Sequence, residues 1–106
     1  MKISVALCTY NGQQFIDEQL DSIFTQTFPV DEVIICDDCS NDNTVEIIQK
    51  YMVKYPSIIQ LYINEKQLKT IKNFEKAISL TTGDYIFLCD QDDIWMPQKV
   101  QKMIKN

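Results

Sequence analysis

Short apolar runs alternate along the whole chain with segments in which apolar residues recur every three or four positions. Nearly continuous apolar runs are typical of strands buried on both faces. Four such runs occupy residues 2–8, 33–36, 58–63 and 85–89. The helical spacing between them predicts amphipathic helices. These helices are expected over residues 13–26, 44–54 and 71–80, with a last one that has Pro97 in its first turn.

The alternation of strand and helix predicts an α/β fold with three layers, in which helices cover both faces of a mainly parallel sheet. The third run mixes apolar and polar residues more than the others do, which indicates a less buried strand. No internal repeat or linker interrupts the 106 residues, so we expect a single domain over residues 1–106.

Polar residues follow the first, second and fourth predicted strands. Right-handed crossovers between parallel strands place these three strand ends along one edge of the sheet. Ligands of open parallel sheets bind at this edge. The side chains that we expect to meet there are those of Thr9, Asn11, Asp37, Asp38, Asp90 and Asp92.

Residues 90–93 hold three carboxylates within four positions, directly after a buried run. The chain contains no histidine or arginine that would neutralise them. Mg²⁺ or Mn²⁺ would relieve the repulsion, because hard cations prefer carboxylate oxygens and commonly bring phosphates with them. Two acidic strand ends on one edge therefore indicate a nucleotide site in which a metal ion offsets the charge of a diphosphate. An acidic loop that is merely solvated is the alternative.

The composition narrows the classes of function. With 45% hydrophobic and 24% charged residues, the chain is an ordinary globular protein rather than a disordered one. Its net charge of −5 argues against nucleic acid as a partner. Two glycines are too few for a glycine-rich phosphate loop. No apolar run has the length of a membrane span, so we expect a cytoplasmic protein, or one at the cytoplasmic face of a membrane.

The four cysteines need a separate interpretation. Cys8, Cys36 and Cys89 each end an apolar run, which favours small buried core residues. The Cys36-x-x-Cys39 spacing also occurs in zinc sites and redox pairs. Acidic residues fill the intervening positions and no second close pair exists, so we expect a structural role, with zinc binding and redox chemistry as alternatives.

Four stretches of the chain resemble family 2 glycosyltransferases, which are inverting enzymes with the GT-A fold. They cover residues 3–12, 20–27, 32–44 and 83–95. The resemblance implies the N-terminal, Rossmann-like, nucleotide-binding half of an enzyme that transfers a sugar from a UDP- or dTDP-linked donor to a saccharide or lipid-linked acceptor. The form Asp-Gln-Asp-Asp-Ile-Trp at residues 90–95 is similar to that of rhamnosyltransferase-like bacterial members, which build surface polysaccharides.

The resemblance also implies roles for the acidic residues. Asp90 and Asp92 match the family's Asp-x-Asp motif, so Asp92 is expected to bind Mn²⁺ or Mg²⁺. Asp90 is expected beside the metal, the ribose and the donor sugar. Asp38, with Asp37 beside it, matches the position that contacts the nucleobase.

Two further segments belong to the implied nucleotide site. Thr9, Tyr10 and Asn11 match the loop that lines the nucleotide pocket. Many members carry Asn-x-Gly between the third strand and the next helix, whereas residues 67–69 read Gln-Leu-Lys. A lysine thus replaces a permissive glycine. We expect Lys69 to contribute to nucleotide-sugar binding as a point charge near the phosphates, although a solvated loop lysine is the alternative.

The family places its general base and acceptor site in a later segment, so the catalytic base is expected beyond residue 106. A chain without that segment is expected to have little or no activity. Two other classes remain open: a catalytically incomplete binding module, which could form a homodimer that hides an apolar patch, and a metal-dependent phosphoryl or nucleotidyl transferase. Peripheral association of the full-length protein with a membrane is also compatible with the sequence.

Overall fold

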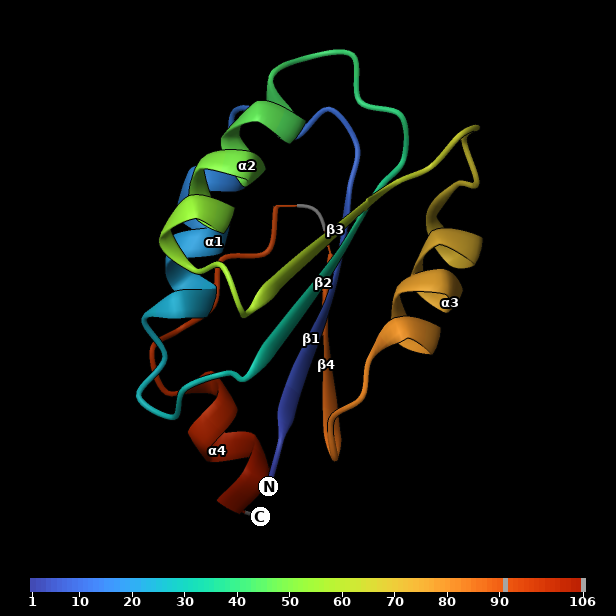
Figure 1. Cartoon of the computed structure of the whole chain (residues 1–106). Coiled ribbons are helices and arrows are strands. Elements are labelled where there is room, and N and C mark those ends of the chain that lie inside the picture. Colours follow the sequence, from blue (N-terminus) through green and yellow to red (C-terminus); the bar gives the residue numbers. More distant parts are fainter. Residues whose placement is uncertain (91, 106) are drawn as a thin grey trace.

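The computed structural model describes residues 1–90 and 92–105, in which strands and helices alternate (Figure 1). The strands are β1 (Ile3–Thr9), β2 (Glu32–Asp37), β3 (Ile59–Ile63) and β4 (Tyr85–Cys89). The helices are α1 (Ile16–Phe24), α2 (Thr44–Lys54), α3 (Thr70–Leu80) and α4 (Lys99–Lys105). Within the part of the chain that the structure describes, no helix is long and apolar enough to cross a membrane.

The four strands are all parallel, and their order across the sheet is β3-β2-β1-β4. Thr9 at the end of β1 lies opposite Asp37 of β2, which in turn lies opposite Ile63 of β3. On the other side of β1, Leu7 pairs with Cys89 of β4. The carboxyl ends of the strands therefore meet at one edge of the sheet, toward the top of Figure 1.

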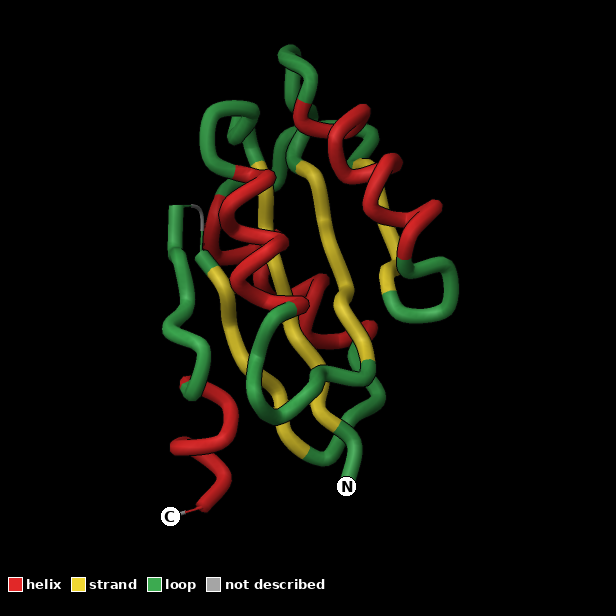
Figure 2. The backbone as a smooth tube through the Cα atoms, turned by 90° about the vertical axis from the view of Figure 1, so that its left-hand side faces the viewer, coloured by secondary structure: helices red, strands yellow, loops and turns green. Residues whose placement is uncertain are grey.

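Helices α1, α2 and α4 lie on one face of the sheet and α3 lies on the other, so the predicted three-layer α/β arrangement is confirmed (Figure 1). Figure 2 looks onto the first face and shows α1 in front of the strands. The main core fills the space between this face and its helices. Its fully buried members include Val5, Leu7, Leu20, Ile23, Val33, Ile35 and Ile48.

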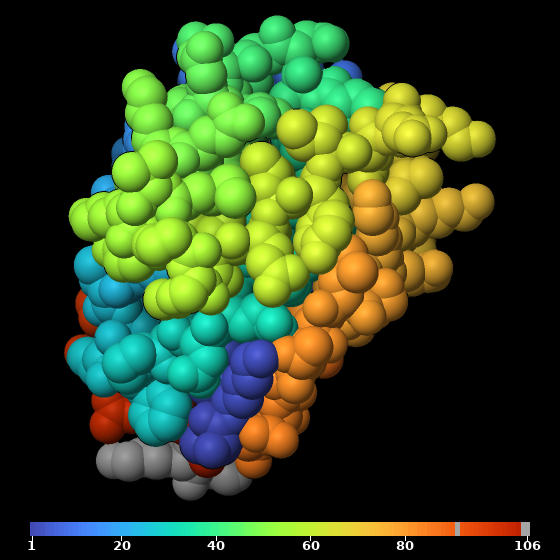
Figure 3. Space-filling model, in the orientation of Figure 1, coloured from blue at the N-terminus to red at the C-terminus, as the bar shows by residue number. Residues whose placement is uncertain are grey.

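The second face is covered by α3, which packs on β1 and β2 through a smaller core. That core consists of Ala6, Cys8, Ile34, Cys36 and Ala77. The edge strand β3 is less buried, as its alternating pattern predicts, and its atoms reach the surface between those of α2 and α3 (Figure 3). At the opposite edge, Ile86 and Leu88 of β4 are 42% and 51% exposed.

The predicted helices are present, but their ends differ by a few residues. Helix α1 begins at Ile16 rather than at residue 13, because Gly12 O accepts hydrogen bonds from both Phe15 N and Ile16 N, at 2.9 Å each. These bonds make a separate turn before the helix. The last helix begins at Lys99, so Pro97 lies in the turn before the helix and not in its first turn as predicted. The local turn chemistry, rather than the apolar spacing, sets these boundaries.

Candidate functional site

A cleft of about 330 Å³ opens at the carboxyl ends of β1, β2 and β4. Residues 67–73, from the loop before α3 and the first turn of that helix, supply another wall. The lining residues are Cys8, Thr9, Tyr10, Asp38, Gln67, Lys69, Thr70, Asn73 and Asp90. The structure thus brings together five of the predicted site residues, namely Thr9, Tyr10, Asp38, Lys69 and Asp90.

Asp38 is 4% exposed, and three donors hold its carboxylate. Oδ1 accepts hydrogen bonds from Asn64 Nδ2 (2.9 Å) and Leu68 N (2.7 Å), and Oδ2 accepts one from Lys69 N (2.8 Å). Burial by itself would raise the pKa of Asp38, but these bonds and the charge of Lys76 lower it below its ordinary value. The carboxylate is therefore ionised at neutral pH, and Oδ2 retains capacity to accept a hydrogen bond from a ligand.

Asp37 does not line the cleft, although its place in the sequence predicted a role in the nucleotide site. Its side chain has no exposed surface. Oδ1 accepts hydrogen bonds from Thr9 Oγ1 and Ser40 Oγ (2.6 Å each), and Oδ2 accepts one from Ser40 N (2.9 Å). Cys39 has a φ of 68°, in the left-handed region, which turns the chain back so that Ser40 meets this carboxylate. Asp37 therefore ties the end of β1 to the loop after β2.

Asn11 also lies away from the cleft, unlike its neighbour Tyr10, which lines the cleft and is 39% exposed. The backbone N–H of Asn11 donates to Ser40 Oγ (2.9 Å), and its Oδ1 accepts a hydrogen bond from Asn41 N (2.7 Å). Its φ of 48° is one that asparagine tolerates better than most residues. The observed role of Asn11 is thus to join the loop after β1 to the loop after β2.

Lys69 lines the cleft from a strained backbone position. Its φ of 71° and ψ of 171° belong to a region that is essentially restricted to glycine. Its backbone N–H donates a hydrogen bond to Asp38 Oδ2 (2.8 Å). A charge-assisted hydrogen bond of this kind is stronger than a neutral one, and it offsets part of the strain. The replacement of the family's glycine by lysine is therefore accommodated by Asp38.

The loop after β4 is organised through its backbone. Asp90 O accepts hydrogen bonds from Gln19 Nε2 (2.6 Å) and Asp93 N (3.1 Å), and Asp90 N donates to Asp93 Oδ2 (3.1 Å). Asp90, Asp92 and Asp93 are all exposed, and Asp92 has a φ of 74°. Asp90 borders the cleft, whereas Asp92 is not among its lining residues. Gln91, the middle residue of the Asp-x-Asp motif, lies outside the described residues.

The donor chemistry of this loop fits a hard divalent cation, because Asp90 and Asp92 offer exposed carboxylate oxygens. Among residues 1–90 and 92–105, no three acidic, cysteine or histidine side chains converge into a preformed metal cage. Mg²⁺ and similar ions are commonly held by one or two carboxylates together with phosphate oxygens and water. The loop therefore matches an open site that a phosphate ligand completes, rather than a closed structural one.

The cysteines have the properties of core residues. Cys8, Cys36 and Cys89 are buried free thiols, and Cys39 Sγ donates a hydrogen bond to Asn64 O (3.2 Å). Burial raises the pKa of Cys8 and that of Cys89 to about 12, and it also raises the pKa of Cys36. Thiol redox chemistry requires the thiolate, so these protonated thiols favour the structural role over redox chemistry. No three potential metal ligands converge around these cysteines in the described part of the chain, which favours the structural role over zinc binding as well.

Two buried polar residues that shape the cleft were not predicted as site residues from the sequence. Asn73 lines the cleft and is 2% exposed, and Gln19, which holds the backbone of Asp90, is also 2% exposed. Each occupies a core position on the apolar stripe of its helix, one turn before Ala77 and Ile23 respectively. A polar residue at such a position is unusual unless it has a buried partner, and this was the signal that the sequence offered.

A parallel α/β sheet with a cleft at its strand ends and an adjoining acidic loop is typical of nucleotide-binding proteins. Residues 4–106 match Glycosyl transferase family 2, and the chain belongs to this family. The dTDP-rhamnosyl transferase RfbG of Shigella flexneri is 37% identical over 102 residues, which cover 92% of this chain and 35% of RfbG. The chain spans about a third of the length of the curated relatives that it matches.

Solved structures agree with this assignment. TarS 1-349 of S. aureus, in complex with UDP-GlcNAc, has a TM-score of 0.88 and 30% identity over 99% of this chain and 30% of that chain. The mannosyltransferase PcManGT from Pyrobaculum calidifontis, in complex with GDP-Man and Mn²⁺, has a TM-score of 0.89 and 25% identity over 98% of this chain and 31% of that chain. The predicted family and GT-A fold class are thereby confirmed.

Proposed function

We propose that residues 1–106 form the donor-binding and metal-binding domain of an inverting glycosyltransferase, which transfers a sugar from a nucleoside diphosphate sugar to a saccharide or lipid-linked acceptor. The observation that carries this proposal is the cleft at the strand ends, where Asp38, Lys69 and Asp90 border one space of about 330 Å³. A nucleoside diphosphate offers a base, ribose hydroxyls and phosphate charge, and the cleft provides a group suited to each.

Five of the residues that line the cleft have a proposed role in donor binding. Asp38 Oδ2 accepts a hydrogen bond from the nucleobase, because this oxygen accepts one described hydrogen bond and its carboxylate is ionised. Asp90 accepts hydrogen bonds from the ribose and the donor sugar. Tyr10, which is partly exposed, and Thr9 form the wall along the nucleotide. Lys69 interacts with the phosphates as a point charge.

Asp92, together with Asp90, would hold Mn²⁺ or Mg²⁺ in the Asp-x-Asp motif. The ion, when bound, stabilises the negative charge of the departing nucleoside diphosphate. Gln19 keeps the start of this loop in place through its 2.6 Å hydrogen bond to Asp90 O. The Mn²⁺ in the complex of PcManGT with GDP-Man supports the use of a divalent ion by this chain as well.

Transfer with inversion is a single displacement at the anomeric carbon. The acceptor hydroxyl oxygen forms a bond to that carbon, the bond from carbon to the diphosphate oxygen breaks, and a general base takes the hydroxyl proton. We assign this base to a segment outside these 106 residues, since Asp93 lies in the metal loop beside the leaving group. The chain by itself is then expected to bind the donor without transferring the sugar.

The relatives support the choice of donor and setting. RfbG is named as a dTDP-rhamnosyl transferase, and TarS forms its complex with UDP-GlcNAc, which favours a dTDP- or UDP-linked donor. A relative from Bacillus subtilis is named as a putative teichuronic acid biosynthesis glycosyltransferase, which supports a role in bacterial surface polysaccharide synthesis. We place the longer protein in the cytoplasm, in peripheral contact with the inner face of the membrane.

The test is calorimetric titration of UDP and dTDP, each with and without Mn²⁺, into the wild type and the Asp92→Asn variant. Asparagine keeps the shape of the side chain and tolerates the φ of 74° at this position. Mn²⁺ should strengthen nucleotide binding at least about tenfold in the wild type and have a much smaller effect in the variant, which keeps Asp90 but loses one carboxylate charge.

The matched control is Asp17→Asn, which removes the same charge from an exposed position on α1 outside the cleft. This control should retain the response to Mn²⁺. A folded wild type that binds neither nucleotide in the presence of Mn²⁺ would contradict the proposal. A metal response in Asp92→Asn that is as large as that of the wild type would contradict the assignment of Asp92 as a metal ligand.

The exposed apolar side chains of the edge strand β4 support one further part of the proposal, a homodimer. Ile86 and Leu88 are exposed on an edge strand, and edge strands tend to pair with other chains. Two copies that meet at this edge would cover both side chains. Sedimentation equilibrium should then show a dimer for the wild type and a monomer for Leu88→Lys, and a wild type that stays monomeric would rule the dimer out.

A further inference from the structure

A chain of buried polar groups lies directly behind Asp38. Asn64 Nδ2 donates hydrogen bonds to Asp38 Oδ1 (2.9 Å) and to Asn73 Oδ1 (2.8 Å). Asn73 Nδ2 donates to Cys36 O of β2 (2.9 Å), and Lys76 Nζ donates to Asn64 Oδ1 (2.6 Å). Asn64 and Asn73 are 6% and 2% exposed. Each amide oxygen and nitrogen of the two asparagines thus has a partner.

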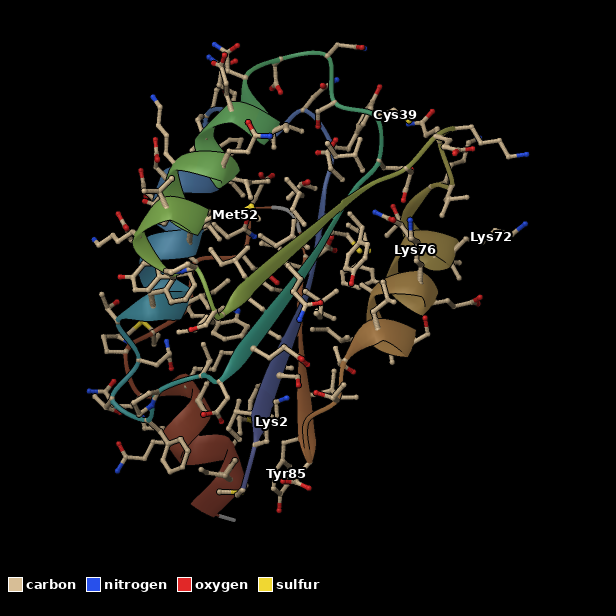
Figure 4. The ribbon with its side chains drawn as sticks, viewed as in Figure 1. Lys2, Cys39, Met52, Lys72, Lys76 and Tyr85 are labelled. Atoms are coloured by element: carbon tan, nitrogen blue, oxygen red, sulfur yellow. The ribbon has the colours of Figure 1, made fainter. Side chains whose placement is uncertain are left out.

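This network connects helix α3 to the wall of the cleft. Lys76 lies on the side of α3 that faces the sheet, whereas Lys72, one turn earlier, extends away from it into solvent (Figure 4). Lys76 holds the oxygen of Asn64, and this leaves the amide nitrogen of Asn64 directed at Asp38 and Asn73. A rotated amide would bring its nitrogen against the ammonium and its oxygen against the carboxylate, which is unfavourable for both contacts.

The carboxylate that receives this support in turn holds a strained loop. Asp38 accepts the backbone N–H groups of Leu68 and Lys69, at 2.7 Å and 2.8 Å. The positive φ of Lys69 is a strained backbone conformation, and such a conformation persists where surrounding contacts determine it. If the Asp38 carboxylate moved, the hydrogen bonds from Leu68 N and Lys69 N would be lost together. The position of this wall of the cleft therefore depends in part on Asn64 and Lys76, which do not line the cleft.

We propose that Asn64, Asn73 and Lys76 are positioning residues for the nucleobase side of the donor site, an inference that rests on the function proposed above. They fix the carboxylate plane of Asp38, so that Oδ1 accepts two hydrogen bonds from the protein, while Oδ2 accepts one and is presented to the base. Asn64 and Lys76 act through Asp38 and are not among the residues that line the cleft. The diphosphate end of the donor would lie with the acidic loop and the side chain of Lys69, and Lys69 contacts this network only through its backbone N–H.

The test uses Lys76→Met, which removes the ammonium at the outer, half-buried end of the network and keeps an apolar stem of similar length. Lys76→Arg restores a cationic donor. Lys72→Met is the matched control, because it removes the same charge from the same helix at an exposed position. UDP, dTDP and inorganic pyrophosphate are titrated into each protein in the presence of Mn²⁺.

Lys76→Met should bind the preferred nucleotide about tenfold more weakly, which corresponds to the loss of a charge-assisted hydrogen bond, and should bind pyrophosphate within about twofold of the wild type. Lys72→Met and Lys76→Arg should bind the nucleotide within about twofold of the wild type. The backbone amides of Leu68 and Lys69 should exchange faster with solvent in Lys76→Met, while the amides of β1 keep their protection, which shows that the variant is folded.

The outcomes separate this inference from the proposed function. A wild type that binds neither nucleotide overturns both. A wild type that binds a nucleotide, together with a Lys76→Met variant of unchanged affinity, overturns the positioning role and leaves the function in place. Equal losses for the nucleotide and for pyrophosphate also overturn it, because they indicate a general structural effect or a loss of long-range charge rather than a defect at the base.

Discussion

Two acidic loops lie at the same edge of the sheet, and the structure surrounds them in opposite ways. After β2, Asp37 and Asp38 are 0% and 4% exposed, and each carboxylate accepts three hydrogen bonds from the protein. After β4, Asp90, Asp92 and Asp93 are exposed, and the Asp93 carboxylate accepts the N–H of Asp90. In the sequence, both loops are simply clusters of aspartate after an apolar run.

The difference shows how one residue type serves two purposes at one site. A buried carboxylate is unfavourable unless hydrogen-bond donors surround it. Asp37 and Asp38 are tolerated in the interior because the neighbouring loops supply these donors, and the same bonds fix the loops in place. Exposed carboxylates keep their hydration and can exchange it for a cation. The loop after β2 therefore shapes the cleft, and the loop after β4 is the one suited to metal binding.

The largest expected effect is a difference in stability between the same substitution in the two loops. Asp37→Asn replaces one carboxylate oxygen, which accepts hydrogen bonds, by an NH₂ group that would meet the hydrogen-bond donors of Thr9 or Ser40. The substitution should lower the free energy of unfolding by about 3 kcal/mol. Asp92→Asn should change it by no more than about 0.5 kcal/mol, because the side chain is exposed. Urea denaturation at pH 7 measures both. Equal losses would mean that the two loops do not differ as described.

The next effect concerns the strain that Asp38 holds in place. Lys69→Gly should raise the free energy of unfolding by about 1 kcal/mol, since glycine relieves the left-handed backbone but adds entropy to the unfolded chain. Lys66→Gly, in the same exposed loop and without a positive φ, should give no increase. Urea denaturation of the two variants beside the wild type provides the measurement. A destabilised Lys69→Gly variant would indicate that the lysine side chain matters more than its backbone.

A third effect appears in the dependence of stability on pH. The pKa of Asp38 is lowered in the folded protein, so its contribution to stability is fully present above the ordinary value of 3.8 and is lost as pH falls through the lower folded value. When the pH is lowered from above 3.8 to below the folded value, the free energy of unfolding should therefore fall less for Asp38→Asn than for the wild type. Urea denaturation at several acidic pH values measures the two slopes. Identical slopes would show that the donors around Asp38 do not favour its ionised form.

The smallest effect is expected within the loop after β4. Asp93→Asn retains an amide oxygen that can accept the N–H of Asp90, and the side chain is exposed. The free energy of unfolding should fall by about 0.5 kcal/mol or less. Thermal or urea denaturation without nucleotide is the appropriate measurement. A loss as large as that of Asp37→Asn would show that this loop, too, is held mainly by its carboxylates.

Much of the fold could be predicted from the sequence, because the determinants are local and repeated. The buried strands β1 and β2 have nearly continuous apolar sequences, and α2 and α3 were predicted to within one residue at each end. The chain order of strands and helices then restricts the sheet to a parallel arrangement with its polar strand ends at one edge. Family membership followed from stretches spread over the whole chain.

The tertiary structure decided which polar residues serve the cleft and which serve the fold. Asp37 and Asp38 are adjacent and chemically identical, yet one is sealed behind Thr9 and Ser40 while the other borders the cleft. The donors to Asp38 lie 26, 30 and 31 residues away in the sequence. Apolar burial depends on local periodicity, whereas the environment of a carboxylate depends on donors brought to it from distant segments, and only the folded chain assembles them.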